Sequence, residues 1–163
     1  MSIWWSLHLR REAASVPLAR RFLLGTMETA GVDPDISFDL SVALSEACAN
    51  AVEHGGDLTA PGDSGTGRPR ADSGQYRVTA YLDGEKCRIE VSDSGPGFPA
   101  RRALRPAAHS HRAETETEAE SGRGLDLIQQ LSDHVQFGNR PGRGAVVSFD
   151  KVLKWREGAL LTV

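Results

Sequence analysis

The sequence is poor in the features that several large classes of protein require. Only two of its 163 residues are cysteine, Cys48 and Cys87, and they form no CxxC pair. Both lie within apolar periodic segments, so we interpret them as reduced core residues rather than as a disulfide or a metal site. The N-terminus lacks the basic and apolar regions of a signal peptide, and no run approaches the ~20 apolar residues of a membrane span. We therefore expect a cytoplasmic protein that does not cross a membrane.

An excess of positive charge is also absent. Charged residues make up 25% of the chain, its net charge is -3, and its pI is about 5.9. This balance supplies no basic field for a polynucleotide, so direct binding to nucleic acid is disfavoured. The length suits one domain with a single core, and no internal repeat is visible. We therefore expect residues 1–163 to form one domain.

Hydrophobic periodicity predicts the elements of the N-terminal third. Residues 3–10 alternate between apolar and polar positions, as in a half-buried strand. Ser15 is placed as the N-cap of a first helix, which ends at Gly31. The Asp-Pro-Asp sequence at 33–35 then opens a second helix, which ends before Gly55.

The later part of the chain predicts mostly strands. Alternation resumes over 76–91 around an Asp83-Gly84 turn, which predicts a hairpin. A helix over about 124–132 and strands at about 134–137 and 145–153 complete the order. Because helices and strands are segregated rather than alternating one for one, we predict an α+β fold, a two-layer sandwich with helices on one face of a mostly antiparallel sheet.

Two segments lack the periodicity of a helix or a strand. Residues 55–74 are rich in Gly, Pro, Asp, Ser and Thr and too poor in large apolar side chains to offset the entropy of ordering, so we expect a mobile loop. Over residues 100–121, arginines precede a run of glutamates. We interpret that segment as a flexible lid.

Polar residues on the second predicted helix share one strip. At ~100° per residue, Glu46, Asn50 and His54 fall together, beside the apolar stripe rather than opposite to it. The stripe consists of Leu40, Leu44, Ala47 and Ala51. A polar strip at this border can line a pocket, although polar flanks are also common on ordinary amphipathic helices.

Two glycine-containing segments follow later in the chain. Asp93-Ser94-Gly95-Pro96-Gly97 comes directly after a predicted strand, where Gly95 and Gly97 allow positive φ and close approach of a ligand. Gly122-Arg123-Gly124 is predicted to open a helix, whose free N–H groups and dipole favour phosphate oxygens. Alone, the first is typical of a turn and the second of a helix cap or hinge. Neither matches the P-loop or the dinucleotide fingerprint.

In combination and in this order, the three segments resemble the GHKL ATPase family, also called the Bergerat fold. Residues 44–54 and 93–99 are most similar to the anti-sigma-factor serine/threonine kinases of that family. The resemblance extends from about Leu9 to about Phe149. It implies a histidine-kinase-like ATPase fold in which ATP lies between the helical layer and the lid.

The resemblance also implies a role for each motif residue. Glu46 would be the general base, and Asn50 would ligate a magnesium ion bound to the ATP phosphates. A carboxylate can accept a hydroxyl proton, and an amide oxygen suits a hard cation, so these residue types fit the tasks. Asp93 would accept the amino hydrogen of adenine, and Arg123 would contact the γ-phosphate.

The expected function is therefore an ATP-binding anti-sigma regulatory factor with serine/threonine kinase activity toward an antagonist protein of the STAS type. The expected cofactors are ATP and Mg, and the expected partners are that antagonist and a sigma factor. Arg20 and Arg21 match positions at which such kinases present basic residues to partners, but paired arginines are more often a solvated helix face. Trp4 and Trp5 point to opposite faces of the first strand, which could leave one indole exposed at an interface, as in a homodimer.

Two other functions fit the same motifs. The chain could bind ATP, or no nucleotide at all, and sequester a partner without transferring phosphate. It could also be a detached ATP-binding domain of a histidine kinase, which would require a phosphoacceptor helix pair supplied by another protein. An assay for the phosphorylated residue would distinguish the three.

Overall fold

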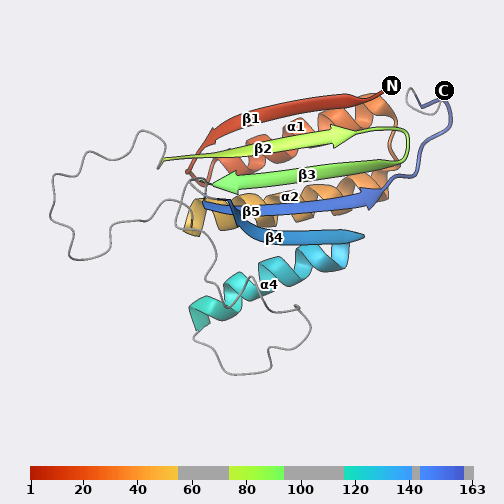
Figure 1. Cartoon of the computed structure of the whole chain (residues 1–163). Coiled ribbons are helices and arrows are strands. Elements are labelled where there is room, and N and C mark those ends of the chain that lie inside the picture. The colour runs from red at the N-terminus through yellow and green to blue at the C-terminus, as the bar shows by residue number, and fades with distance from the viewer. Residues whose placement is uncertain (55–73, 94–115, 141–143, 160–163) are drawn as a thin grey trace, which may run out of the picture.

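The computed structural model of the chain describes residues 1–54, 74–93, 116–140 and 144–159 (Figure 1). Over 116–123 it defines the backbone alone. The described elements are β1 (Ile3–Arg10), α1 (Ser15–Ala30), α2 (Pro34–His54), β2 (Gln75–Leu82), β3 (Lys86–Asp93), α4 (Glu116–Leu131), β4 (His134–Arg140) and β5 (Gly144–Val152).

The strands form one sheet in the order β1-β2-β3-β5-β4, and every neighbouring pair is antiparallel. In Figure 1, α1 and α2 lie together behind this sheet, and α4 lies below β4. α4 packs against α2, so the helices form one layer. The predicted two-layer α+β sandwich is therefore confirmed.

The core lies between the two layers because alternate strand residues point toward the helices. On β3 the helix-facing residues include Cys87, Ile89 and Val91, and all three are buried. They meet a stripe of small and aliphatic residues on α2, where Leu40 and Leu44 are fully buried. Among the described residues, the other side chains in this fully buried set are Leu23, Met27, Val32, Cys48, Val78, Leu82, Ile128 and Phe149.

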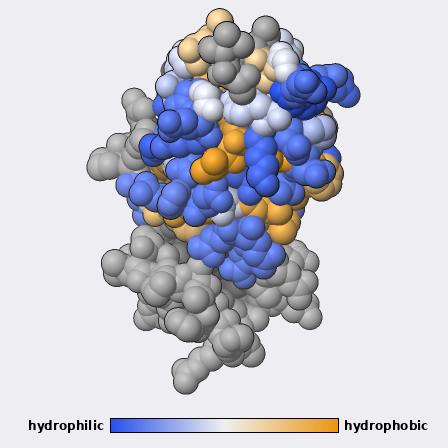
Figure 2. Space-filling model, turned by 90° about the vertical axis from the view of Figure 1, so that its right-hand side faces the viewer, coloured by the Kyte–Doolittle hydropathy of each residue, from blue (hydrophilic) through white to orange (hydrophobic). Residues whose placement is uncertain are grey.

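The described part of the chain contains no helix that is long and apolar enough to span a membrane. The end of the molecule at the right of Figure 1 is mostly hydrophilic, with small hydrophobic areas among polar residues (Figure 2). Both cysteines are free and buried, which confirms their assignment as reduced core residues.

Two helix boundaries differ from the prediction. Ser15 is not an N-cap: the cap position is Ala14, which makes no side-chain capping bond, and Ser15 is the first helical residue. The hydroxyl of Ser15 instead donates to the carbonyl of Glu12 at 2.7 Å. The helix predicted to open at Gly124 begins at Glu116, so the last residues of the predicted lid are helical. Glu and Ala are strong helix formers, and a polar helix shows no apolar periodicity by which to recognise it.

The C-terminal segment, residues 154–159, returns to the turn between α1 and α2. The N–H of Asp33 donates to the carbonyl of Lys154 at 2.8 Å, and the N–H of Arg156 donates to the carbonyl of Gly31 at 2.7 Å. The guanidinium of Arg156 also donates to the carbonyl of Glu28, at the end of α1, at 2.8 Å. The segment therefore ties the α1–α2 turn to the end of the sheet.

Candidate functional site

Helices α2 and α4 bring together three residues that lie far apart in sequence. A Cβ placed on Gly124 of α4 would lie 3.0 Å from Oε2 of Glu46. It would also lie 3.6 Å from both Oδ1 and Nδ2 of Asn50. The absence of a side chain at Gly124 therefore leaves room for a carboxylate and an amide at the same point. The structure thus places Glu46, Asn50 and Gly124 in one cluster.

The side-chain amide of Asn50 has a buried nitrogen atom. Its Nδ2 atom is buried, and no hydrogen-bond partner for it occurs among the described residues. Buried polar groups are nearly always hydrogen-bonded, so an orphaned amide beside a carboxylate indicates a place for a polar ligand. The two ends of an Asn side chain are interchangeable by a flip, so the group could present either its oxygen or its nitrogen to that ligand. This chemistry fits a phosphate group with its bound magnesium ion.

Asp93 ends β3 on the face of the sheet that carries the core. It lies two residues after Val91, so it points toward the helices, and its side chain is half-buried. Its Oδ1 accepts the N–H of Ala145 at 3.2 Å. This bond holds the carboxylate at the end of the sheet where β5 begins.

Asp93 lies near the C-terminal half of α2. Its direct partner on β2 is Tyr76, and β2 begins next to Gly74, whose carbonyl accepts the N–H of Arg11 at 2.8 Å. The guanidinium of Arg11 in turn donates to the carbonyls of Ala51 and Val52 near the end of α2. The same end of the sandwich therefore carries Asp93 and the polar strip of α2.

The structure describes only some of the remaining predicted site residues. Gly95 and Gly97 lie outside the described residues, as does the side chain of Arg123. Gly122 and Gly124 lie within α4 rather than at its start, so the expectation that their N–H groups are free as a helix N-terminus is wrong for this conformation. Only the first four N–H groups of a helix lack an intrahelical acceptor, and in α4 these belong to residues 116–119.

No local sequence pattern marks the residue that caps α2. The guanidinium of Arg11 donates to the carbonyl of Ala51 at 3.2 Å and to that of Val52 at 2.9 Å. A cation at a helix C-terminus satisfies free carbonyls and interacts favourably with the helix dipole. Arg11 therefore fixes the end of the helix that carries the polar strip. Because the contact spans some forty positions of the chain, only the fold reveals it.

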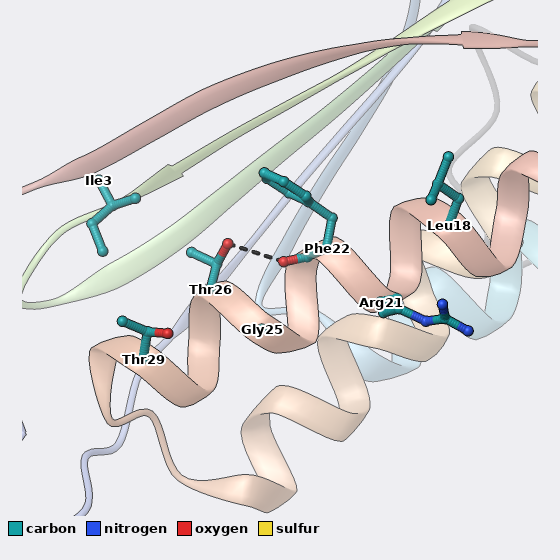
Figure 3. Close-up of a pocket in the computed structure, with 7 residues that line it drawn as sticks. All are labelled: Ile3, Leu18, Arg21, Phe22, Gly25, Thr26 and Thr29. Carbon is teal, nitrogen blue, oxygen red and sulfur yellow. Dashed lines mark hydrogen bonds between the residues drawn. The ribbon is translucent and has the colours of Figure 1, made fainter.

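A separate groove of about 570 Å³ runs between β1 and the exposed side of α1 (Figure 3). Ile3 lies across from Phe22 and Thr26, and Arg21 extends away from the strand. The full lining is Ile3, Leu18, Arg21, Phe22, Gly25, Thr26 and Thr29. Leu18 is 56% exposed and Phe22 is 46% exposed, so α1 presents apolar side chains to the surface.

Aromatic packing supports one wall of this groove. The ring of Phe22 meets that of Trp5 edge to face at a centroid distance of 4.8 Å. Trp5 is half-buried while Trp4 is well exposed, as expected for neighbours on a strand with one buried face. Arg21 lines the groove, whereas Arg20 is half-buried and does not.

Comparison with known proteins gives consistent results. Residues 9–151 match the sequence model described as a histidine kinase-like ATPase domain. The "Serine-protein kinase RsbW" of Bacillus licheniformis is 31% identical over 143 residues, which is 85% of this chain and 78% of the relative. The "Anti-sigma F factor" of Thermoanaerobacter sp. (strain X514) is 28% identical over 127 residues, which is 76% of this chain and 77% of the relative.

One solved structure extends the likeness to three dimensions. The crystal structure of the RsbU and RsbW domains of a Mycobacterium tuberculosis protein superposes with a TM-score of 0.58 at 19% identity. The match covers 92% of this chain and 33% of that longer chain. At this identity the likeness concerns the fold.

Proposed function

This chain belongs to the histidine kinase-like ATPase family, and we propose that it is a cytoplasmic ATP-dependent serine/threonine protein kinase that regulates a sigma factor by phosphorylating an antagonist protein. The names of the relatives support this proposal, since they include a serine-protein kinase and an anti-sigma factor. The observation that carries it is the cluster of Glu46, Asn50 and Gly124 around an unsatisfied amide.

Glu46 is the group suited to activate the acceptor serine. Its carboxylate takes the proton of the serine hydroxyl as the serine oxygen bonds to the γ-phosphorus and the bond to the ADP oxygen breaks. Asn50 would hold magnesium through its amide oxygen, with the phosphates and water as the other ligands. Magnesium, when bound, neutralises charge on the phosphates.

We place the adenine at the same end of the sandwich as Glu46 and Asn50, but on the sheet rather than on α2. Asp93 is our proposed acceptor for the adenine amino group, an interaction that guanine cannot make because it has an oxygen at that position. Gly95 and Gly97 would allow the chain to approach the adenine, and Arg123 would contact the phosphates.

The decisive experiment incubates the protein with radiolabelled Mg-ATP and candidate antagonist proteins. We expect label on a serine or threonine of one partner, as an acid-stable phosphate ester. Tight ATP binding without transfer to any candidate would instead support a sequestering module. An acid-labile phosphohistidine on a partner would support a detached histidine-kinase domain. If ATP does not bind at all, the proposed function is refuted.

We further propose that a protein partner docks on the groove between β1 and α1. Leu18 and Phe22 supply exposed apolar contacts, and Arg21, with Arg20 nearby, supplies positive charge for an acidic partner residue. Phe22→Asp should weaken partner binding at least about 10-fold, because it buries a charge in an apolar contact. The measurement is titration of the partner by calorimetry, with ATP affinity as a check on folding.

A matched control comes from α2. Phe38 is 57% exposed and does not line the groove, so Phe38→Asp introduces the same charge at a similar exposure elsewhere. We expect it to bind the partner as the wild-type protein does. Unchanged partner affinity in Phe22→Asp would refute docking at this groove.

A further inference from the structure

Arg11 joins three elements at the end of the sandwich that carries the candidate site. It directly follows β1, and its backbone N–H donates to the carbonyl of Gly74, the residue before β2, at 2.8 Å. Its guanidinium donates from Nε to the carbonyl of Ala51 at 3.2 Å and from Nη2 to that of Val52 at 2.9 Å. In Figure 1 the end of β1, the start of β2 and the end of α2 lie together at the left of the sheet. Arg11 therefore ties the end of α2 to the end of the sheet.

The two carbonyls belong to the last turn of α2, which ends at His54. A helix leaves the carbonyls of its last turn without intrahelical donors, so this turn frays unless other groups bind them. Arg11 is half-buried, and hydrogen bonds from a charged donor are stronger than those from a neutral one. The guanidinium therefore stabilises the turn of α2 that is otherwise the least supported.

Asn50 depends on this turn. It directly precedes Ala51, whereas Glu46 lies a full turn earlier, so fraying from the end of α2 reaches Asn50 first. The Nδ2 atom of Asn50 has no hydrogen-bond partner among the described residues. The position of the amide is therefore set mainly by the backbone that carries it.

We infer that Arg11 is a positioning residue of the candidate site, which holds the last turn of α2 so that the amide of Asn50 meets the magnesium ion bound to the ATP phosphates. The inference rests on the proposed function, because that function assigns magnesium to Asn50. In this role Arg11 acts through the backbone of α2. Without the guanidinium the turn frays, the amide is in place for only part of the time, and more magnesium is needed to support the same binding of ATP.

Arg11→Met tests this role, because methionine is unbranched and donates no hydrogen bond. The measurement is the Kd for ATP by calorimetry over a series of magnesium concentrations, well below the Tm of each variant. We expect the magnesium concentration that gives half of the full effect on Kd to rise about 3-fold to 10-fold, in line with partial loss of two hydrogen bonds from a charged group. The Kd for ATP in EDTA should change little. A purely structural role would lower Tm and leave the half-effective magnesium concentration unchanged.

The neighbouring residue supplies a matched control. Arg10 is exposed, and the bonds to the end of α2 come from Arg11 instead. Arg10→Met removes the same charge one residue away, so it reproduces any long-range electrostatic effect. Its magnesium dependence should equal that of the wild-type protein. An equal rise in Arg10→Met and Arg11→Met would refute the inference, because charge alone would explain both.

Arg11→Lys separates the charge from the geometry. Lysine keeps the positive charge but has one terminal nitrogen, whereas two nitrogens of Arg11 reach two separate carbonyls. The half-effective magnesium concentration should rise less than in Arg11→Met and more than in Arg10→Met.

A double-mutant cycle shows whether Arg11 acts through Asn50. Asn50→Ala removes the proposed magnesium ligand, so adding Arg11→Met to it should change the magnesium dependence no further. If Arg11→Met has the same effect with and without the Asn50 side chain, Arg11 acts elsewhere and the inference is refuted.

The outcomes separate this inference from the function beneath it. If the wild-type protein binds no ATP at any magnesium concentration, the proposed function fails. If it binds ATP equally well with and without magnesium, the inference fails while ATP binding stands. If binding depends on magnesium and Arg11→Met leaves that dependence unchanged, the positioning role is refuted and the function stands. Should Arg11→Met fail to fold, Arg11→Lys decides the matter, since a wild-type magnesium dependence in it refutes the role.

Discussion

Glu46→Gln should bind ATP within about 3-fold of the wild-type affinity and yet transfer phosphate at least about 100-fold more slowly. Glutamine has the shape of glutamate and fits beside Gly124, but it cannot accept the serine proton. The variant therefore removes the base and keeps a side chain of the same size next to Gly124. In the wild-type protein, Oε2 of Glu46 lies 3.0 Å from where a Cβ on Gly124 would be. Single-turnover transfer of label at saturating ATP, with Kd from calorimetry, measures the two effects separately.

A distant carboxylate supplies the control for this substitution. Glu28 is exposed near the end of α1, so Glu28→Gln changes the net charge equally without touching the cluster. Its transfer rate should equal that of the wild-type protein. If Glu46→Gln keeps the wild-type transfer rate, Glu46 is not the base. If it instead loses ATP binding, Glu46 holds the nucleotide rather than activating the serine.

Gly124→Ala tests the same cluster from the opposite helix. Replacing glycine by alanine inside a helix normally adds about 0.5–1 kcal/mol of stability. Here the new Cβ would meet Oε2 of Glu46 at 3.0 Å, which is too close, so the carboxylate has to shift. The variant should therefore melt no lower than the wild-type protein and still transfer phosphate about 10-fold more slowly. Gly25→Ala, where a Cβ meets nothing within 4 Å, should gain stability and so measures the effect of alanine on a helix alone.

The sequence predicted the parts of the fold that carry a strong local pattern. Strict alternation marked residues 3–10 and the β2–β3 hairpin, and helical spacing with clear end signals marked α2. Helical spacing together with the family resemblance also selected Glu46 and Asn50, which the structure places beside Gly124. The roles of these residues in binding and transfer remain predictions.

The features that were missed depend on tertiary contacts or on weak patterns. The hydroxyl of Ser15 looked like a helix cap because serine is common there, but its partner Tyr76 lies sixty-one positions away in the sequence. The guanidinium that caps α2 belongs to Arg11, which precedes α1 and lies about forty positions before the carbonyls that it binds. The start of α4 was not predicted because its first turns are polar and charged and so have no apolar stripe.

Gly31→Ala should destabilise the fold by about 2–5 kcal/mol, because two separate costs add at this residue. Gly31 ends α1 with φ at +89°, a left-handed conformation that costs a side chain about 1–2 kcal/mol. A Cβ there would also lie 2.6 Å from Cβ and 2.8 Å from Cα of Ala159, and such overpacking costs about 1–3 kcal/mol. For a domain of this size the Tm should fall by about 4–20 °C, measured by calorimetry or circular dichroism.

Gly158 separates the two costs. It has φ at +79°, but a Cβ there meets nothing within 4 Å, so Gly158→Ala should lose the backbone term alone. The difference between the two variants then measures how firmly the C-terminal segment, residues 154–159, is held against the α1–α2 turn. Adding Ala159→Gly to Gly31→Ala removes the 2.6 Å contact and should recover part of that difference. Equal losses in Gly31→Ala and Gly158→Ala would mean that the segment moves away at little cost, and that its bonds to Gly31 and Asp33 contribute little to stability.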